Sequence, residues 1–197
     1  MKNIAVLVLA AGKSTRMKSI KQLVKLGNQT LLELTLDKAK QLATNSIYCV
    51  LGANANLIKS KIKTENIHFI LNDNYNNGLS SSIIAGIHHF KKNKIQLDGF
   101  LVLLADQPAI SVAYLQEIIN LFYKNTSKII ASNYGDFLGV PALFPSKYLE
   151  DLQLIKGDKG AKIFINQNTE NTLSPKMKAN LVDIDTKQDL DSYNKSI

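Results

Sequence analysis

The sequence predicts an α/β fold in which a mostly parallel sheet lies between two layers of helices. Short apolar runs alternate with segments whose apolar residues recur at helical spacing, and this alternation is typical of βαβ units. The chain has 197 residues, of which 45% are hydrophobic. Because this is enough to bury one core, we expect a single domain over residues 1–197. Right-handed crossovers would place helices on both faces, giving a three-layer α/β/α sandwich.

Each element follows from a local pattern. Six apolar runs are the expected strands: 4–9, 47–51, 67–71, 99–104, 128–131 and 181–184. Five segments of helical periodicity are the expected helices: 31–42, 56–62, 80–90, 112–123 and 159–166. The runs 129–134 and 137–144 flank Gly135 and Asp136, which predicts a hairpin in place of another βα unit. Open parallel sheets bind ligands beyond the carboxyl ends of their strands, so the residues that follow each strand are the candidate site residues.

Composition narrows the classes of partner. The formal net charge of +8 and the pI near 9.4 indicate an anionic partner, either nucleic acid or a small polyphosphate. Because the lysines are spread along the chain and no tryptophan is present, we expect no nucleic-acid partner. The single cysteine, Cys49, excludes an internal disulfide, and the three histidines lack the spacing of zinc ligands. The first apolar run, 4–11, is too short to span a membrane, so we expect a cytoplasmic protein without a membrane partner.

The first expected strand leads directly into a loop of small, hydroxyl-bearing and basic residues. These are Ala10, Ala11, Gly12, Lys13, Ser14, Thr15 and Arg16, with Lys21 shortly after them. Small residues let the backbone approach a ligand, N–H and hydroxyl groups can meet phosphate oxygens, and Arg16 and Lys21 supply positive charge. The loop therefore has the composition of a triphosphate cradle. A plain βα turn before a basic surface segment is the alternative that composition leaves open.

Two common phosphate-binding motifs are excluded in this loop. Gly12, Lys13 and Ser14 resemble the end of a P-loop, but that motif needs a glycine five positions before Gly12, where Leu7 stands. The dinucleotide-binding motif needs three spaced glycines, and Gly12 is alone in this turn.

Aspartates follow two of the expected strands. Asp106 comes soon after the run 99–104, and its carboxylate is a hard oxygen ligand suited to Mg²⁺ beside triphosphate oxygens. The alternative is a turn former or helix N-cap before Ser111. Asp183 and Asp185 lie on one side of the last expected strand, and either one would complete a metal site with Asp106. Asp185 is equally suited to cap a final helix.

Six segments together carry a resemblance to a known family. They lie at 9–17 with 21–23, 78–82 with Gly86, 105–108, 139–144, 157–161, and 183–186 with 189–190. In this order they resemble the MobA-like nucleotidyltransferases of molybdenum-cofactor maturation, most closely the molybdenum cofactor cytidylyltransferase branch. The resemblance implies a nucleotide-diphospho-sugar transferase-like fold. It also implies Mg²⁺-dependent transfer of a nucleotidyl group to a small phosphorylated acceptor, and transient contact with a molybdoenzyme or its chaperone.

The resemblance also implies roles for individual residues. It places the nucleotide against Ala10, Ala11, Gly12, Lys13, Ser14, Thr15, Arg16, Lys21, Gly78, Ser80, Ser81 and Ser82. It places Mg²⁺ against Asp106 and Asp185, and the acceptor against Gln107, Gly139, Pro141 and Asp158. Lys21, Arg16 and Asp106 would carry the catalysis. The start of the loop, Ala-Ala-Gly, favours CTP over GTP, because guanylyl relatives usually have a second glycine there.

Two positions depart from the family pattern. Lys18 stands where relatives usually carry glycine, and Val140 stands where they often carry histidine. The alternatives are therefore guanylyl or other nucleotidyl transfer to a different acceptor, such as a sugar phosphate, and a nucleotide-binding module without turnover.

Overall fold

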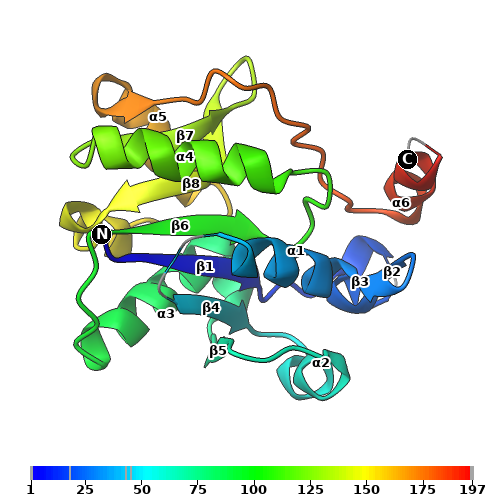
Figure 1. Ribbon diagram of the computed structural model, residues 1–197. Coiled ribbons are helices and arrows are strands. Elements are labelled where there is room, and N and C mark those ends of the chain that lie inside the picture. The colour runs from blue at the N-terminus through cyan, green and yellow to red at the C-terminus, as the bar shows by residue number, and fades with distance from the viewer. Residues whose placement is uncertain (1, 18, 43, 45, 196–197) are drawn as a thin grey trace.

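A computed structural model describes residues 2–17, 19–42, 44 and 46–195 (Figure 1). Its strands are β1 (Ile4–Ala10), β2 (Lys25–Leu26), β3 (Gln29–Thr30), β4 (Ser46–Leu51), β5 (His68–Leu71), β6 (Gly99–Leu104), β7 (Ile129–Asn133), β8 (Leu138–Pro145) and β9 (Thr172–Leu173). Its helices are α1 (Leu31–Lys40), α2 (Ala55–Lys61), α3 (Leu79–Lys92), α4 (Val112–Lys124), α5 (Gly160–Gln167) and α6 (Lys187–Asn194). The five expected helices are confirmed to within two residues at each end.

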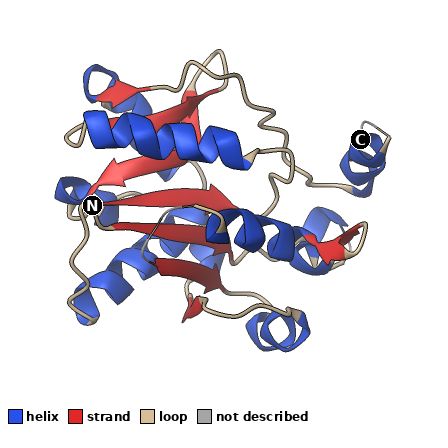
Figure 2. Cartoon of the chain, viewed as in Figure 1, coloured by secondary structure: helices blue, strands red, loops and turns tan. Residues whose placement is uncertain are grey.

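One sheet of seven strands forms the middle layer, in the order β5-β4-β1-β6-β8-β7-β9. β1 pairs in parallel with both β4 and β6, whereas β8 runs antiparallel to both of its neighbours. The predicted hairpin is formed by β7 and β8, where the Tyr134 amide donates to the Phe137 carbonyl at the turn. A separate two-stranded ribbon, β2–β3, lies beyond the carboxyl end of β1 (Figure 2).

The two faces of the sheet are both buried, which confirms the three-layer α/β fold. Val6 and Val8 of β1 belong to an apolar cluster that includes α1, α2 and α4. Leu7 and Leu9 belong to a second cluster on the opposite face, which includes α3 and α5. α1 and α4 lie in front of the sheet in Figure 1, and α3 lies behind it. Within the described part of the chain, no helix is both long and apolar enough to cross a membrane.

The expected strand at 181–184 is wrong. Residues 174–186 have no regular structure and pass across the carboxyl ends of the strands before α6 begins (Figure 1). Of this apolar run only Ile184 is buried, and its amide donates to the Asp106 carbonyl at 2.9 Å. A segment that crosses strand ends cannot pair along an edge, and the edge position next to β7 is taken by β9.

Candidate active site

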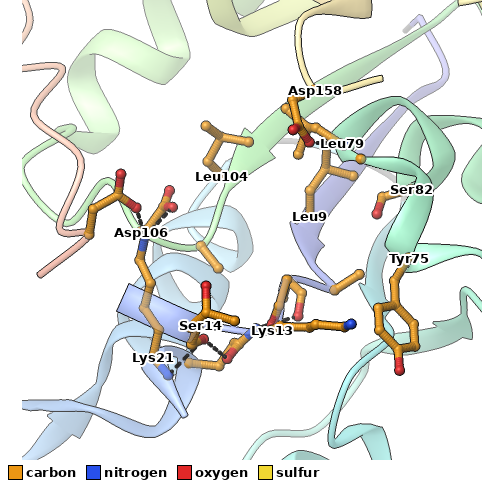
Figure 3. A pocket seen from close by; sticks show the side chains of 18 of the residues that line it. Leu9, Lys13, Ser14, Lys21, Tyr75, Leu79, Ser82, Leu104, Asp106 and Asp158 are labelled. Carbon is orange, nitrogen blue, oxygen red and sulfur yellow. Dashed lines mark hydrogen bonds and ion pairs between the residues drawn. The ribbon is translucent and has the colours of Figure 1, made fainter. Parts of the chain in front are cut away.

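A cavity of about 730 Å³ opens at the carboxyl ends of β1 and β6 (Figure 3). Five stretches of chain reach it: the end of β1 with the loop that follows, residues 75–82, the end of β6, the loop before α5 and the segment before α6. The lining residues are Leu9, Ala10, Ala11, Gly12, Lys13, Ser14, Thr15, Arg16, Lys21, Gln22, Tyr75, Asn76, Gly78, Leu79, Ser82, Leu104, Ala105, Asp106, Asp158, Asp183 and Asp185. Its size lies within the usual range for small-molecule sites.

Gln22 holds the loop that follows β1. Its side-chain amide donates to the carbonyls of Ala10 at 2.7 Å and Gly12 at 3.0 Å. The Ser14 hydroxyl donates to the Gln22 side-chain oxygen at 3.2 Å and accepts from the Lys21 amide at 3.0 Å. Ser14 takes a left-handed conformation with φ of 58°, in which its side chain faces the segment that carries Lys21. These bonds fix the loop in an open curve around one end of the cavity.

Lys21 lies between two carboxylates. Its ammonium is 2.6 Å from Asp106 Oδ2 and 2.6 Å from Asp185 Oδ1, and the Lys21 side chain is only 12% exposed. Arg16, which is largely exposed, places Nη1 2.8 Å from Asp185 Oδ2. Figure 3 shows Lys21 reaching across to Asp106. The two carboxylates therefore converge from distant parts of the sequence.

These carboxylates fit a divalent cation. Asp106 Oδ1 is buried, and no hydrogen-bond donor for it lies among the described residues. Together with Asp185 it offers the hard oxygens that Mg²⁺ and Mn²⁺ prefer. The described chain has no group of three metal-ligating side chains, so the remaining ligands would be phosphate oxygens and water, as is usual for Mg²⁺ bound with a nucleotide.

Asp106 lies in a turn, as one alternative expected, but neither Asp106 nor Asp185 is the N-cap of a helix. The N-cap of α4 is Ser111, whose hydroxyl accepts from the Tyr114 amide at 3.1 Å, so Asp106 caps no helix. The N-cap of α6 is Thr186, which forms a capping box with Asp189. Asp185 is thus free of a capping role, although its amide donates to Asp189 Oδ2 at 3.0 Å.

Asp183 adds a third carboxyl group at the cavity mouth. Desolvation raises the pKa of Asp183 to about 6, and repulsion from Asp106 and Asp185 acts in the same direction. Hydrogen bonding from Gln107 opposes this rise. Because Asp183 as a whole residue is exposed, we attribute the rise in its pKa to repulsion by the neighbouring carboxylates as much as to desolvation.

The other half of the cavity is formed by the start of α3 and the loop before α5. Gly78 has φ of 87°, and a side chain there would collide with Asp158, whose Oδ1 would lie 2.6 Å from the added carbon. The Asp158 carboxylate accepts from the Leu79 amide at 3.1 Å, which closes the two segments against each other. Lys13 extends toward Tyr75 and lies 5.8 Å from the centre of its ring (Figure 3).

Most of the expected site residues line this cavity, and five do not. Ser80 and Ser81 use their hydroxyls within the fold, as donors to the carbonyls of Gly157 at 2.5 Å and Gly78 at 2.7 Å. Gln107 is buried and donates to the Tyr134 hydroxyl at 2.8 Å. Gly139 and Pro141 are buried in β8.

The structure describes one of the two departures from the family pattern. Val140 is buried in the apolar cluster under α3 and α5, and Lys18 lies outside the described residues. Gln22, Tyr75 and Asn76 line the cavity without having been predicted as site residues. The sequence offered one signal for Gln22, namely that it directly follows Lys21. Tyr75 and Asn76 lie in an asparagine-rich stretch, which is typical of a turn and so gave no sign of a binding role.

The fold and this cavity place the chain among α/β proteins of the nucleotide-diphospho-sugar transferase type. A parallel sheet presents a basic loop after its first strand and converging carboxylates at the same edge. The chain belongs to the MobA-like NTP transferase family, because residues 6–172 match the model of the MobA-like NTP transferase domain. Asp183 and Asp185 lie beyond the matched region.

Individual proteins support this assignment. A bifunctional protein GlmU from Buchnera aphidicola is 34% identical over 119 residues, which cover 59% of this chain and 25% of that protein. The chain thus spans about a quarter of the length of the curated relatives it matches. The crystal structure of an Rv0371c homolog from Mycobacterium sp. strain JC1 is 26% identical, with a TM-score of 0.84 over 98% of this chain and 96% of that chain. Rv0371c from Mycobacterium tuberculosis, solved in complex with manganese, shares the fold at 23% identity, with a TM-score of 0.79 over 99% and 100% of the two chains.

Proposed function

We propose that this protein transfers a cytidylyl group from CTP to the terminal phosphate of the molybdenum cofactor and releases pyrophosphate. The observation that carries the nucleotidyl-transfer part is the convergence of Lys21, Asp106 and Asp185 beside the basic loop. The choice of CTP rests on Ala10 and Ala11 at the start of that loop, and the acceptor rests on the family resemblance. Transient contact with a molybdoenzyme in the cytoplasm follows from that acceptor.

The proposed reaction is an in-line displacement. A phosphate oxygen of the acceptor attacks the α-phosphorus of the nucleotide, a new P–O bond forms, and the bond to the bridging oxygen of the β-phosphate breaks. The acceptor phosphate is already ionised near neutral pH, so the reaction needs no dedicated general base, and catalysis rests on positioning and charge neutralisation.

The residues of the cavity divide this work. The Lys21 ammonium would turn from the carboxylates to the α-phosphate, and Arg16 would offset charge on the leaving pyrophosphate. Amides and hydroxyls of the loop from Ala10 to Thr15 would bind the β- and γ-phosphates. Asp106 and Asp185 would hold Mg²⁺, which supplies charge neutralisation to the phosphate oxygens when bound.

Pyrophosphate release provides the test. Purified protein with Mg²⁺ receives CTP, GTP, ATP or UTP, each with and without molybdenum cofactor that carries no nucleotide. We expect release with CTP only when the cofactor is present, and Asp106→Asn serves as the inactive control.

Other outcomes would support the alternatives. Release that requires GTP, or that requires a sugar phosphate in place of the cofactor, would contradict the cytidylyl proposal but keep nucleotidyl transfer. Tight CTP binding without release with any acceptor would identify a binding module that lacks turnover.

A further inference from the structure

The second carboxylate of the cavity is carried by a segment without regular secondary structure, whose Ala179 and Leu181 pack against the large apolar cluster that includes α1 and α4. We call residues 174–186 the strap. Its start is held where Glu117 of α4 accepts from the amides of Lys176 and Met177. Val182 is 51% exposed and Asp183 is also exposed. Hydrogen bonds between strands therefore do not explain why the Asp185 carboxylate lies close to that of Asp106.

Ile184 is the buried residue of the strap. It is 0% exposed, and it forms a small apolar cluster with Met17, Leu26 and Leu31. This cluster is separate from the two large ones that cover the faces of the sheet. We call residues 10–16 the phosphate loop, because the proposed function places the triphosphate there. Met17 directly follows this loop, so the cluster joins the strap to it.

Backbone bonds on either side of the Ile184 side chain set the position of Asp185. The Ile184 amide donates to the Asp106 carbonyl at 2.9 Å, which links the two carboxylate-bearing residues through the main chain. On the other side, Asp189 accepts from the amides of Asp185 at 3.0 Å and Thr186 at 2.7 Å. Asp185 thus lies between an apolar anchor and the capping box of α6.

We infer that Ile184 is a positioning residue, whose burial beside Met17 holds Asp185 at the distance from Asp106 that a divalent cation needs. This inference rests on the proposed function, because it assigns the metal to those two aspartates. It adds that metal affinity depends on an apolar side chain that touches neither metal nor nucleotide. Outer-shell residues that orient ligands commonly change metal affinity by about 10–100-fold.

Binding of Mn²⁺ in the presence of CTP, measured by electron paramagnetic resonance, tests the inference. We expect Ile184→Ala to weaken Mn²⁺ binding at least about tenfold and Ile184→Val to stay close to the wild type, since valine keeps most of the buried surface. Ile118→Ala is the matched control, because Ile118 is equally buried but lies in α4, in the large apolar cluster between that helix and the sheet. It should lower thermal stability comparably and leave Mn²⁺ affinity unchanged.

Asp185→Ala separates the failure of this inference from the failure of the proposed function. Mn²⁺ affinity that is lost in Asp185→Ala but kept in a folded Ile184→Ala would overturn the positioning role alone. Absence of Mn²⁺ binding from the wild type with every nucleoside triphosphate would overturn both. If Ile184→Ala does not fold, hydrogen exchange of the wild type decides: Mn²⁺ with CTP should slow exchange of the Ile184 amide, and unchanged exchange would overturn the inference.

Discussion

Lys21 lies in a cavity that combines carboxylates with groups suited to binding phosphate. Its ammonium neutralises Asp106 and Asp185, with two contacts of 2.6 Å, while the surrounding loop presents amides and hydroxyls suited to phosphate. A partly buried ammonium between two carboxylates occupies the position that a divalent cation would take. Under the proposed function, lysine and metal would compete for the same oxygens, and metal binding would release Lys21 toward the phosphates.

Replacing Lys21 should separate these two roles. We expect Lys21→Met to lower kcat by about 10²–10³, the usual effect of removing one preorganised electrostatic stabiliser. The same variant should bind Mn²⁺ more tightly than the wild type without nucleotide, because the carboxylates lose their competing cation. Lys13→Met, which removes a charge from the loop but not from the carboxylates, should show no such gain. A loss of kcat below about threefold would remove Lys21 from the proposed mechanism.

The raised pKa of Asp183 makes the stability of the folded chain depend on pH. The pKa of Asp183 is raised to about 6 from an ordinary value of 3.8. The folded state therefore holds this proton more tightly than the unfolded state, and stability is lost as pH rises from about 4 through 6. We expect Asp183→Asn to be more stable than the wild type at pH 7.5 and equal to it near pH 4. Urea unfolding at both pH values, with EDTA present, measures the difference, and a gain that is the same at both would contradict the raised pKa.

At the scale of elements, the phosphate loop is held by a side chain from the segment that follows it. Gln22 is buried and bonds three positions of the loop, Ala10, Gly12 and Ser14. We expect Gln22→Ala to lower the free energy of unfolding by about 1–3 kcal/mol, because the buried Ala10 carbonyl loses its donor, and to weaken CTP binding. Gln41→Ala removes an exposed amide that bonds the Asp37 carbonyl at the end of α1 and should change neither quantity. Equal CTP affinity in the Gln22 variant, measured by calorimetry, would show that the loop keeps its shape without Gln22.

Strands and helices with a clear hydrophobic pattern were predicted from the sequence. Segments whose position depends on contacts with distant residues were not. The strands at 99–104 and 47–51 were predicted because every position in them is apolar, as in strands covered on both faces. The run 181–184 is apolar except at Asp183, yet it belongs to the strap, because apolar character does not determine which backbone groups are paired. Two-residue strands such as β2, β3 and β9 are too short for any period to appear.

The residues of the candidate site also fall into those that the sequence predicts and those that it does not. Lys21 and Asp106 were predicted because they follow strands that end at one edge of the sheet, and the structure places them 2.6 Å apart. Gln22 and Tyr75 were missed because their roles depend on contacts with distant or irregular backbone. Ser80 and Ser81 match a family motif, but the first turn of α3 directs their hydroxyls to backbone carbonyls rather than into the cavity.

At the scale of the whole molecule, the two apolar layers share their strands. Along β1, Val6 and Val8 pack on one side and Leu7 and Leu9 on the other. Loss of one layer would therefore expose one face of the same strands on which the other layer packs. We expect the described fold to unfold in a single cooperative transition, as a single domain would. Far-UV circular dichroism and tyrosine fluorescence should give the same urea midpoint, and two separated midpoints would divide the chain into independent units.

The position of the strap late in the sequence also determines the order in which the parts of the site are synthesised. The phosphate loop and Asp106 precede the strap in the chain, and the anchor at Ile184 comes far later. At synthesis rates of about 5–20 residues per second, several seconds separate the emergence of Asp106 from that of Asp185. During translation the sheet and the phosphate loop can therefore form before the second carboxylate exists. Under the proposed function, a chain without its strap would lack the second metal ligand, so turnover would begin only after residues 174–186 have been made and have taken their place beside Asp106.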